Sequence, residues 1–473
     1  MKTNIEQLAD FAAATPFADL PEVIVDESKR LLLDSLGCAL AGVDNPKGRI
    51  GIDYGRLMGG SGNATIIGTT DKVSPFGAAF ANGELINTLD MDAVLPPGHV
   101  TPYVLPGALA LAETAGSSGK ELIRSIAVSH EISWRMGKAM DYLRDMQDGM
   151  LSTPPVFGYS STIFGATAAI GMLQRQSTET LSHSLGIAGS IPPVQSMMSH
   201  FHHAPSTTIK YLMAGVLVQA AMTAAYMGQM GHRGDVNILD DAEYGFSRFI
   251  GTRRWEPANI TADLGKRWGF NTEQSYKPYP HCRILHAPLD CLAEIIGKHD
   301  ILPDEIDGVN VLVEGFVQKP TWLNKDIRHV HDAQFSIAHG IAVGAQRIPP
   351  GRDWQDPANV FSPSVMNLMN KVTHQVHPNY EKELAAHGAA RPTKVEVHAR
   401  GTTFTAERQY PRGSPSPDPT TRMTNEDLIL KFRHNADGVL TSSAVDDVVD
   451  AVTNLERVPN FSTVMRLVAR SRF

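Results

Sequence analysis

Residues 275–286, SYKPYPHCRILH, combine a lysine, a cysteine, an arginine and two histidines in one short segment. These residue types suit a catalytic loop, a metal-binding loop or a rigid turn between core elements. Lys277 and His281 alternate with Pro278 and Pro280, which restrict the backbone and would hold both side chains in position. The residues of this segment leave the three alternatives open.

A second segment with reactive side chains is NTLDMDAVLPPGHVTP, residues 87–102. Asp90 and Asp92 end a helical pattern, and His99 follows in a Pro-Pro-Gly loop. Two carboxylates near a histidine can cap a helix, bind a cation or perform acid–base chemistry. The spacing alone favours capping at the protein surface.

The third segment, STTIKYLMAGVLVQ (206–219), begins with polar residues and then becomes strongly apolar. This pattern predicts a helix with Lys210 in its first turn, where a cation opposes the helix dipole. A lysine at such a position usually extends its ammonium group to solvent. The alternative is a lysine directed into an anion-binding cleft.

Metal and phosphate sites are the weaker interpretations. The chain contains 18 histidines, some in groups such as HFHH (200–203) and RHVHD (328–332), but no HExxH motif or paired CxxC motif. The glycine-rich stretch GGSGNAT (59–65) lacks the lysine of a phosphate-binding loop, so it predicts a plain turn. We therefore expect no metal site.

The composition describes a soluble globular protein. Of the 473 residues, 42% are apolar and 19% charged, and the net charge of −8 argues against nucleic acid as a partner. Three scattered cysteines indicate a reducing compartment. The N-terminal residues lack the apolar core of a signal peptide, and no apolar run approaches a membrane span. These features predict a cytoplasmic protein with no membrane partner.

Two domains must position these side chains. Apolar residues at helical spacing run through the first half, whereas residues 306–316 alternate with a period of two and residues 393–410 predict a β-hairpin. After a Pro- and Ser-rich linker, Thr424 predicts the start of another helix. We predict an α-rich protein with two domains: a large all-helical domain from both chain ends, residues 1–270 and 412–473, and an inserted smaller α+β domain, residues 271–411.

Taken together, the segments resemble the MmgE/PrpD family, which includes 2-methylcitrate dehydratase, cis-aconitate decarboxylase and iminodisuccinate epimerase. ANGELINTLDMDAVLPPGHVTP is similar to a family pattern of Asn-Gly, helix, Asp-x-Asp and Gly-His. SYKPYPHCRILH is similar to its Lys-x-aromatic-Pro segment. Three further segments follow in the family's order: DDAEYGFSRFIG (240–251), HDAQFSIAHGIAV (331–343) and PRGSPSPDPTTRMTNEDLILKF (411–432).

The resemblance implies an active site in a cleft between a helical and an α+β domain of a homodimer without metal or organic cofactor. It implies small di- or tricarboxylate substrates and proton chemistry at a carbon adjacent to a carboxylate. Cationic side chains would stabilise the negative charge that develops there. The candidate catalytic residues are Asp90, His99, Lys210, Lys277 and His281. The candidate substrate-binding residues are Arg283, Tyr276, Cys282, Thr153 and Tyr159.

The chain departs from the family pattern where proton transfer is expected. Dehydratase and decarboxylase relatives carry a His-Pro pair before the helix near residue 164, but no histidine lies between His130 and His183 here. Thr153 or Val156 takes that place, and Tyr159, His200, His202 or His203 are possible replacements. Decarboxylase relatives also have a histidine at the position of Cys282, whereas here His281 precedes it.

These departures favour a variant chemistry over a standard 2-methylcitrate dehydratase. The first hypothesis is a cofactor-independent lyase, a dehydratase or decarboxylase. An epimerase or isomerase acting on a small dicarboxylate in the same cleft is the second. A non-catalytic carboxylate-binding protein is the third hypothesis, and a zinc-dependent hydrolase is the fourth.

Overall fold

The structure, a computed structural model, describes residues 2–142, 144–147, 150–152, 154, 156–194 and 197–470. It is α-rich and has two domains, as the sequence predicts. The main helices of the larger domain's N-terminal part are α1 (Asn4–Ala14), α2 (Glu22–Gly42), α3 (Pro46–Gly59), α4 (Pro75–Asn87), α5 (Thr101–Ala115), α6 (Gly119–Ala139), α7 (Thr162–Leu173), α8 (Thr178–Ser190) and α10 (Met213–Gln229). Its short helices are α9 (Met197–Phe201), α11 (Phe246–Ile250), α12 (Ala258–Thr261) and α13 (Phe270–Glu273).

Small residues let the helices of this domain pack closely. A side chain at Gly55 of α3 would place its Cβ 2.7 Å from the carbonyl oxygen of Gly77 in α4. Only glycine permits that approach of two helix backbones. Helix α4 is buried along almost its whole length, and the residues that follow it enter the interior of the protein.

The smaller domain contains a four-stranded sheet in the order β10-β9-β7-β8. Its strands are β7 (Ile306–Val313), β8 (Val372–Val376), β9 (Thr393–Ala399) and β10 (Thr402–Arg408). Strands β7 and β8 are parallel, and the other neighbours are antiparallel. The strand predicted over residues 306–316 is confirmed as far as Val313, after which Gly315–Val317 form a 3₁₀ turn. The predicted hairpin is confirmed, with Arg400 and Gly401 in the turn.

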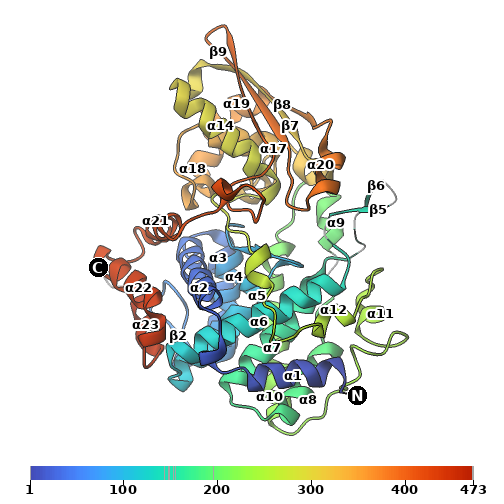
Figure 1. The fold of residues 1–473 in the computed structure, drawn as a ribbon. Helices are drawn as coiled ribbons and strands as arrows, with labels where there is room; N and C mark the ends of the chain where they lie inside the picture. Colours follow the sequence, from blue (N-terminus) through green and yellow to red (C-terminus); the bar gives the residue numbers. More distant parts are fainter. Residues whose placement is uncertain are drawn as a thin grey trace.

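Helices α14 (His286–His299) and α17 (Ile337–Gly344) pack together and contact the sheet. The remaining helices of this domain are α15 (Pro320–Leu323), α16 (Val330–Ala333), α18 (Pro357–Val360), α19 (Pro363–Asn370) and α20 (Tyr380–Ala386). Figure 1 shows this domain above the helices α1 to α8 and α10.

The chain returns to the helical domain in α21 (Asn425–Ala436), α22 (Ser442–Thr453) and α23 (Ser462–Leu467), and α21 packs on α2 (Figure 1). Thr424 and Asp427 form the capping box that starts α21, as the sequence predicts. All four strands of the sheet lie within the predicted range 271–411, and the boundary positions themselves stay a prediction.

The larger domain also contains three two-stranded ribbons, so the prediction that it is all-helical is incomplete. They are β1 (Ala64–Thr65) with β2 (Lys72–Val73), β3 (Val94–Leu95) with β4 (Gly98–His99), and β5 (Asp145–Gln147) with β6 (Met150–Ser152). Strands of two or three residues are too short to produce a period-two pattern in the sequence.

One stretch of the described chain, Ile209–Gln229, is long and apolar enough to cross a membrane by length and composition. Its most apolar window is 61% buried inside the protein. Core helices of globular proteins have these same properties, so the stretch is weak support for a membrane span.

Candidate active site

The turn after α4 is fixed by side chains from distant parts of the chain. Four successive carbonyl groups, those of Thr88 to Met91, each accept a hydrogen bond. The donors are Gln334 to Thr88, Gln355 to Leu89, Lys277 to Asp90 and Lys431 to Met91, at 3.4, 3.2, 2.7 and 2.7 Å. Asp90 has a φ of 55°, in the left-handed region that non-glycine residues rarely adopt. The inserted domain and α21 therefore hold this turn in place.

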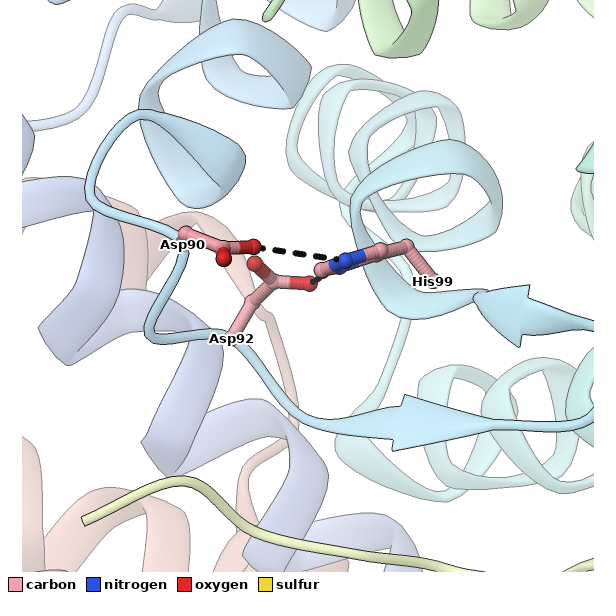
Figure 2. A group of neighbouring side chains, drawn as sticks. All are labelled: Asp90, Asp92 and His99. Atoms are coloured by element: carbon pink, nitrogen blue, oxygen red, sulfur yellow. Dashed lines mark hydrogen bonds and ion pairs between the residues drawn. The ribbon is translucent and has the colours of Figure 1, made fainter. Parts of the chain in front are cut away.

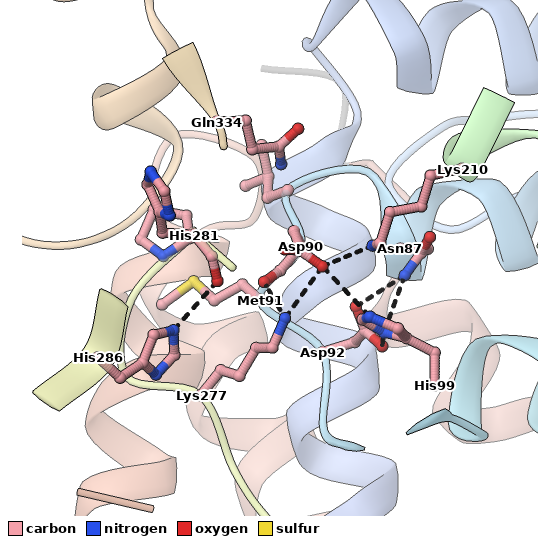
Figure 3. A network of polar contacts seen from close by, with 12 residues as sticks. Asn87, Asp90, Met91, Asp92, His99, Lys210, Lys277, His281, His286 and Gln334 are labelled. Atoms are coloured by element: carbon pink, nitrogen blue, oxygen red, sulfur yellow. Dashed lines mark hydrogen bonds and ion pairs between the residues drawn. The ribbon is translucent and has the colours of Figure 1, made fainter. Parts of the chain in front are cut away.

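The carboxylate of Asp90 is the centre of a buried charge network (Figure 3). Its Oδ1 accepts a hydrogen bond from Lys210 Nζ at 2.6 Å and lies 3.0 Å from Lys277 Nζ and 3.3 Å from His99 Nε2. All four side chains are buried. Spacing alone predicted Asp90 on the surface and Lys210 in solvent, and both expectations are wrong, because Lys210 and Lys277 reach Asp90 from elements distant in the sequence. Lys210 lies on a 3₁₀ turn, Ile209–Tyr211, that precedes α10.

His99 and Asp92 form a hydrogen-bonded pair beside Asp90 (Figure 2). His99 Nδ1 lies 2.6 Å from Asp92 Oδ2, while Asn87 donates to Asp92 Oδ1 at 2.9 Å. Gly98, with a φ of 152°, brings the loop against Tyr159, since a Cβ at Gly98 would lie 2.0 Å from that ring. When Nδ1 donates its hydrogen to Asp92, Nε2 of a neutral His99 is left as the basic nitrogen.

Burial and the neighbouring charges set the protonation states of this network. Burial would raise the pKa of Asp90, but Lys210, Lys277 and His99 hold it well below its ordinary value. The pKa of Asp92 is likewise lowered, against the effect of burial, mainly by His99. Burial lowers the pKa of His99 below 6.5 even though Asp92 opposes the shift. At pH 7 both carboxylates are charged and His99 is neutral.

Four side chains of this network, Asp90, His99, Lys210 and Lys277, line a cavity of about 650 Å³ to which both domains contribute. The helical domain supplies Asp90, His99, Tyr159 and Lys210, and the inserted part supplies Lys277 and Cys282. The predicted charged residues are therefore brought together in one cleft, as expected from the resemblance.

Asp90, Asp92 and His99 also have the geometry of a potential metal site, because their ligand atoms lie within 4.8 Å of one another (Figure 2). The same Asp90 oxygen, however, already contacts two ammonium groups. A divalent cation placed there would lie beside two like charges, which is electrostatically unfavourable. The donor set therefore fits a lysine-binding carboxylate better than a metal ligand.

Two predicted site residues do not line the cavity. Tyr276 is buried, and its hydroxyl donates to Glu27 at 2.7 Å, so a substrate-binding role for it is wrong. His281 is also buried, and its Nε2 lies close to Gly340, where an added Cβ would be 2.7 Å away. Burial lowers its pKa to about 4. A packed, neutral imidazole at this position does not fit the predicted catalytic role.

Of the possible replacements for the family histidine, Tyr159 is the one in the cavity. Its ring contacts the edge of His99 with centroids 5.9 Å apart, and burial raises its pKa. His200 is buried outside the lining, with its Nδ1 3.0 Å from Thr207 Oγ1, and His202 and His203 are exposed. Thr153 lies outside the described residues.

Cys282 lines the cavity directly, whereas His286 packs beneath the loop with its Nε2 donating to the His281 carbonyl (Figure 3).

Three arginines form a second cationic group in the same cavity, and the sequence drew attention to only one of them. Arg144 and Arg391 both bind Glu314, and Arg283 donates to Ser414 Oγ at 3.1 Å. Arg144 lies 247 residues before Arg391, so no local pattern connects them.

Asp92, although part of the Asp-x-Asp pattern, was also absent from the predicted catalytic set.

The sequence is similar to those of known enzymes along nearly its whole length. Cis-aconitate decarboxylase of Aspergillus terreus is 24% identical over 484 residues, covering 98% of this chain and 95% of that protein. The cis-aconitate decarboxylases of Homo sapiens and Mus musculus are 23% and 24% identical, with 99% of this chain covered in each case and 95% and 94% of those proteins. Residues 6–258 match the MmgE/PrpD N-terminal domain and residues 279–457 match the MmgE/PrpD C-terminal domain, and the chain therefore belongs to the MmgE/PrpD family.

Proposed function

We propose that the protein is a lyase that dehydrates or decarboxylates a small di- or tricarboxylate at a carbon adjacent to a carboxylate. The observation that carries this proposal is the Asp90 carboxylate, which holds two buried lysines next to a neutral histidine in one cavity. The relatives named cis-aconitate decarboxylase support the same class of reaction and substrate.

The charges of the cavity support an anionic substrate. Six lysines and arginines contribute to the lining, against three aspartates and glutamates. The cations are Lys138, Arg144, Lys210, Lys277, Arg283 and Arg391, and the anions are Asp90, Asp141 and Glu273. A carboxylate that enters this site exchanges its hydration for fixed, partly desolvated cations.

The residues divide the chemistry between them. Lys210 and Lys277 each keep ammonium hydrogens beyond those that contact Asp90, and these can bind the carboxylate next to the reacting carbon. In dehydration, His99 Nε2 removes a proton from that carbon, and the electron pair moves into the carboxylate to form an enediolate, which the two ammonium groups stabilise. The enediolate then collapses, forming a double bond, while the hydroxyl on the neighbouring carbon takes the proton from the conjugate acid of His99 and leaves as water.

Decarboxylation uses the same pattern of charge. The bond to one carboxylate breaks, CO2 leaves, and the electron pair remains on the carbon next to the carboxylate held by the lysines. A proton from a lysine ammonium then completes the product. The neutral state of His99 before substrate binds suits the proton removal that begins dehydration.

Purified protein incubated with cis-aconitate, citrate and 2-methylcitrate tests the reaction, with products followed by proton NMR in deuterated water. We expect loss of water or CO2 from at least one acid, and no turnover by a Lys277→Ala variant. Deuterium exchange at a stereocentre without net elimination would instead support the epimerase. Binding without exchange or turnover would support the non-catalytic alternative.

We also propose that the protein is a cytoplasmic homodimer with no nucleic acid or membrane partner. Helices α3 and α10 both pack on α4 and expose apolar side chains, among them Ile50, Leu57 and Val216. Exposed apolar side chains on neighbouring helices suit a protein–protein contact. The free thiols of Cys38, Cys282 and Cys291 suit a reducing compartment. Sedimentation equilibrium should give twice the chain mass, and Leu57→Glu should shift it towards the monomer.

A further inference from the structure

The charge balance differs between two groups of cations that line the cavity. In the lysine group, two carboxylates, Asp90 and Asp92, face two ammonium groups, Lys210 and Lys277, so the network is neutral when His99 is neutral. In the arginine group, Arg144 and Arg391 pair with the single carboxylate of Glu314, and Arg283 pairs with no carboxylate of the described chain. The arginine group therefore keeps a net positive charge that no described ion pair offsets.

The three arginines have different partners. Arg144 comes from the helical domain and donates to Glu314, Tyr380 Oη and the carbonyls of Gly388 and Ala390. These contacts join the two domains and position Glu314. Glu314 in turn binds the guanidinium of Arg391. Because of these contacts, we assign Arg144 the role of holding the two domains together, and not that of binding a ligand.

Arg391 and Arg283 keep donors that no described side chain uses. Arg391 is 6% exposed, and its Nε is buried with no hydrogen-bond partner among the described residues. Arg283 is half-buried and donates to Ser414, and no carboxylate of the described chain lies within 4.0 Å of its guanidinium. An unpartnered guanidinium donor in a buried site is unfavourable unless a ligand satisfies it.

The lowered pKa of Arg283 is consistent with a site that binds an anionic ligand next to its guanidinium group. Burial, and then the charges of Arg391 and Arg144, lower its pKa well below the ordinary value, and Glu314 offsets this only in part. A bound carboxylate would relieve that repulsion. The planar guanidinium group also matches a carboxylate in a two-point contact, which an ammonium group cannot make.

We propose that Arg283 and Arg391 form a subsite for a second carboxylate of the substrate, distant from the carboxylate held by Lys210 and Lys277. The subsite selects acids with anionic groups at two separated positions over monocarboxylates of the same size. This inference rests on the proposed function, because it names the class of acid that the same cavity accepts. Arg283 belongs to the segment that also carries Lys277 and Cys282, so one loop contacts both ends of the substrate.

Calorimetric titration with unreactive acids tests the subsite separately from the reaction. The probes are succinate, glutarate, adipate and tricarballylate, which lack the double bond or hydroxyl needed for turnover, and glutaramate, which keeps the size of glutarate but has one carboxylate. We expect the wild-type protein to bind one of the dicarboxylates or tricarballylate at least tenfold more tightly than glutaramate. The best chain length reports the separation of the two cationic groups.

Arg283→Gln should reduce that preference to about twofold or less without unfolding the protein, since no carboxylate loses an ion-pair partner. Arg283→Lys should retain part of the preference. Arg328→Gln, which removes an exposed arginine that pairs with Asp326, is the matched control. This variant should keep the full preference for the dicarboxylate over glutaramate. Circular dichroism and the melting temperature of each variant establish that it is folded.

An unchanged preference in Arg283→Gln, or an equal loss in Arg328→Gln, would overturn the subsite. So would inorganic sulfate displacing every acid equally with no dependence on chain length, since that describes an unspecific anion site. If Arg283→Gln loses the preference while the wild-type protein shows no lyase activity, the subsite stands and the proposed reaction fails. If the protein is an active lyase and Arg283→Gln keeps the preference, the proposed reaction stands and the subsite fails.

Discussion

Lys277 contacts Asp90 twice: its Nζ donates to the Asp90 carbonyl at 2.7 Å and lies 3.0 Å from the Asp90 carboxylate. The first contact fixes the backbone of a turn with a positive φ, and the second sets the position of the lysine's charge in the cavity. One residue of the inserted domain thus both shapes the turn after α4 and supplies a cation to it. This double contact makes Lys277 the most informative residue to change.

Lys277→Met should lower kcat/KM by about 10²–10³ or more, because the transition state loses a fixed positive charge. It should also destabilise the fold by about 1–3 kcal/mol, because a buried carbonyl loses its donor. Steady-state kinetics and urea unfolding measure the two effects. Lys382→Met, at an exposed position on α20, is the control and should change neither. Wild-type activity in folded Lys277→Met would remove the lysine from the mechanism.

Asp92→Asn tests the histidine pair. The substitution keeps the shape of the side chain but removes the charge that accepts the His99 Nδ1 hydrogen, so the imidazole loses its fixed tautomer. We expect kcat to fall by about 10²–10⁴ with the substrate Kd within a few-fold of wild type. Pre-steady-state kinetics and equilibrium binding separate these quantities. A large loss of binding with normal kcat would show that Asp92 only positions the substrate.

The pH profile should follow His99. Its pKa lies below 6.5 in the folded protein, so His99 is neutral and able to accept a proton at pH 7. In the dehydration direction, kcat/KM should therefore be flat from about pH 8 to 6.5 and decline by about tenfold per unit once the pH falls below the folded pKa. Since the Asp92 charge raises this pKa, Asp92→Asn should move the decline to lower pH. A decline that begins above pH 7 would contradict His99 as the base.

Stability should decrease in mild acid. Burial lowers the pKa values of His130, His200 and His281 from 6.5 to about 4. Between these values the three histidines bind up to three more protons in the unfolded chain, whereas Glu84, whose pKa burial raises to about 8, binds up to one more in the folded chain. These four groups therefore lower the free energy of unfolding by up to about 3 kcal/mol per pH unit. The stability linked to the histidines is fully present above pH 6.5 and is lost as the pH falls towards 4. Urea unfolding at pH 7, 6 and 5 measures the slope, and His130→Asn should reduce it by about half.

His281→Asn should leave the chemistry intact. His281 packs against Gly340 and does not line the cavity, so kcat and KM of the folded variant should stay within about threefold of wild type. The melting temperature should fall, because the smaller side chain leaves part of the space unfilled. A folded, ligand-binding but inactive variant would reinstate the proton-transfer role expected from the sequence.

The fold could be predicted from the sequence because the sequence patterns that indicate each helix and strand are local. Helical spacing in the first half, the alternation of residues 306–316 and the capping box at Thr424 each involve residues within a few positions. The three short ribbons were missed because two or three residues produce no pattern. Local signals of this kind report which element forms and not which side chains it buries.

The site could be predicted only in part, because its contacts join residues that are distant in the sequence. The resemblance brought together Asp90, His99, Lys210 and Lys277, while spacing alone left Asp90 and Lys210 in solvent. Their burial depends on partners more than 100 residues away, and no local pattern contains those contacts. Arg144 and Arg391 resemble ordinary surface arginines until Glu314 brings them into one cavity.

The bond from Lys431 to the Met91 carbonyl has a consequence for synthesis on the ribosome. Lys431 lies 340 residues after Met91, and its ammonium group also binds the buried Asp34 at 2.6 Å. A nascent chain can fold many of its helices early, but the turn after α4 lacks its last donor until α21 has emerged. We therefore expect newly made protein to become active only near the end of translation.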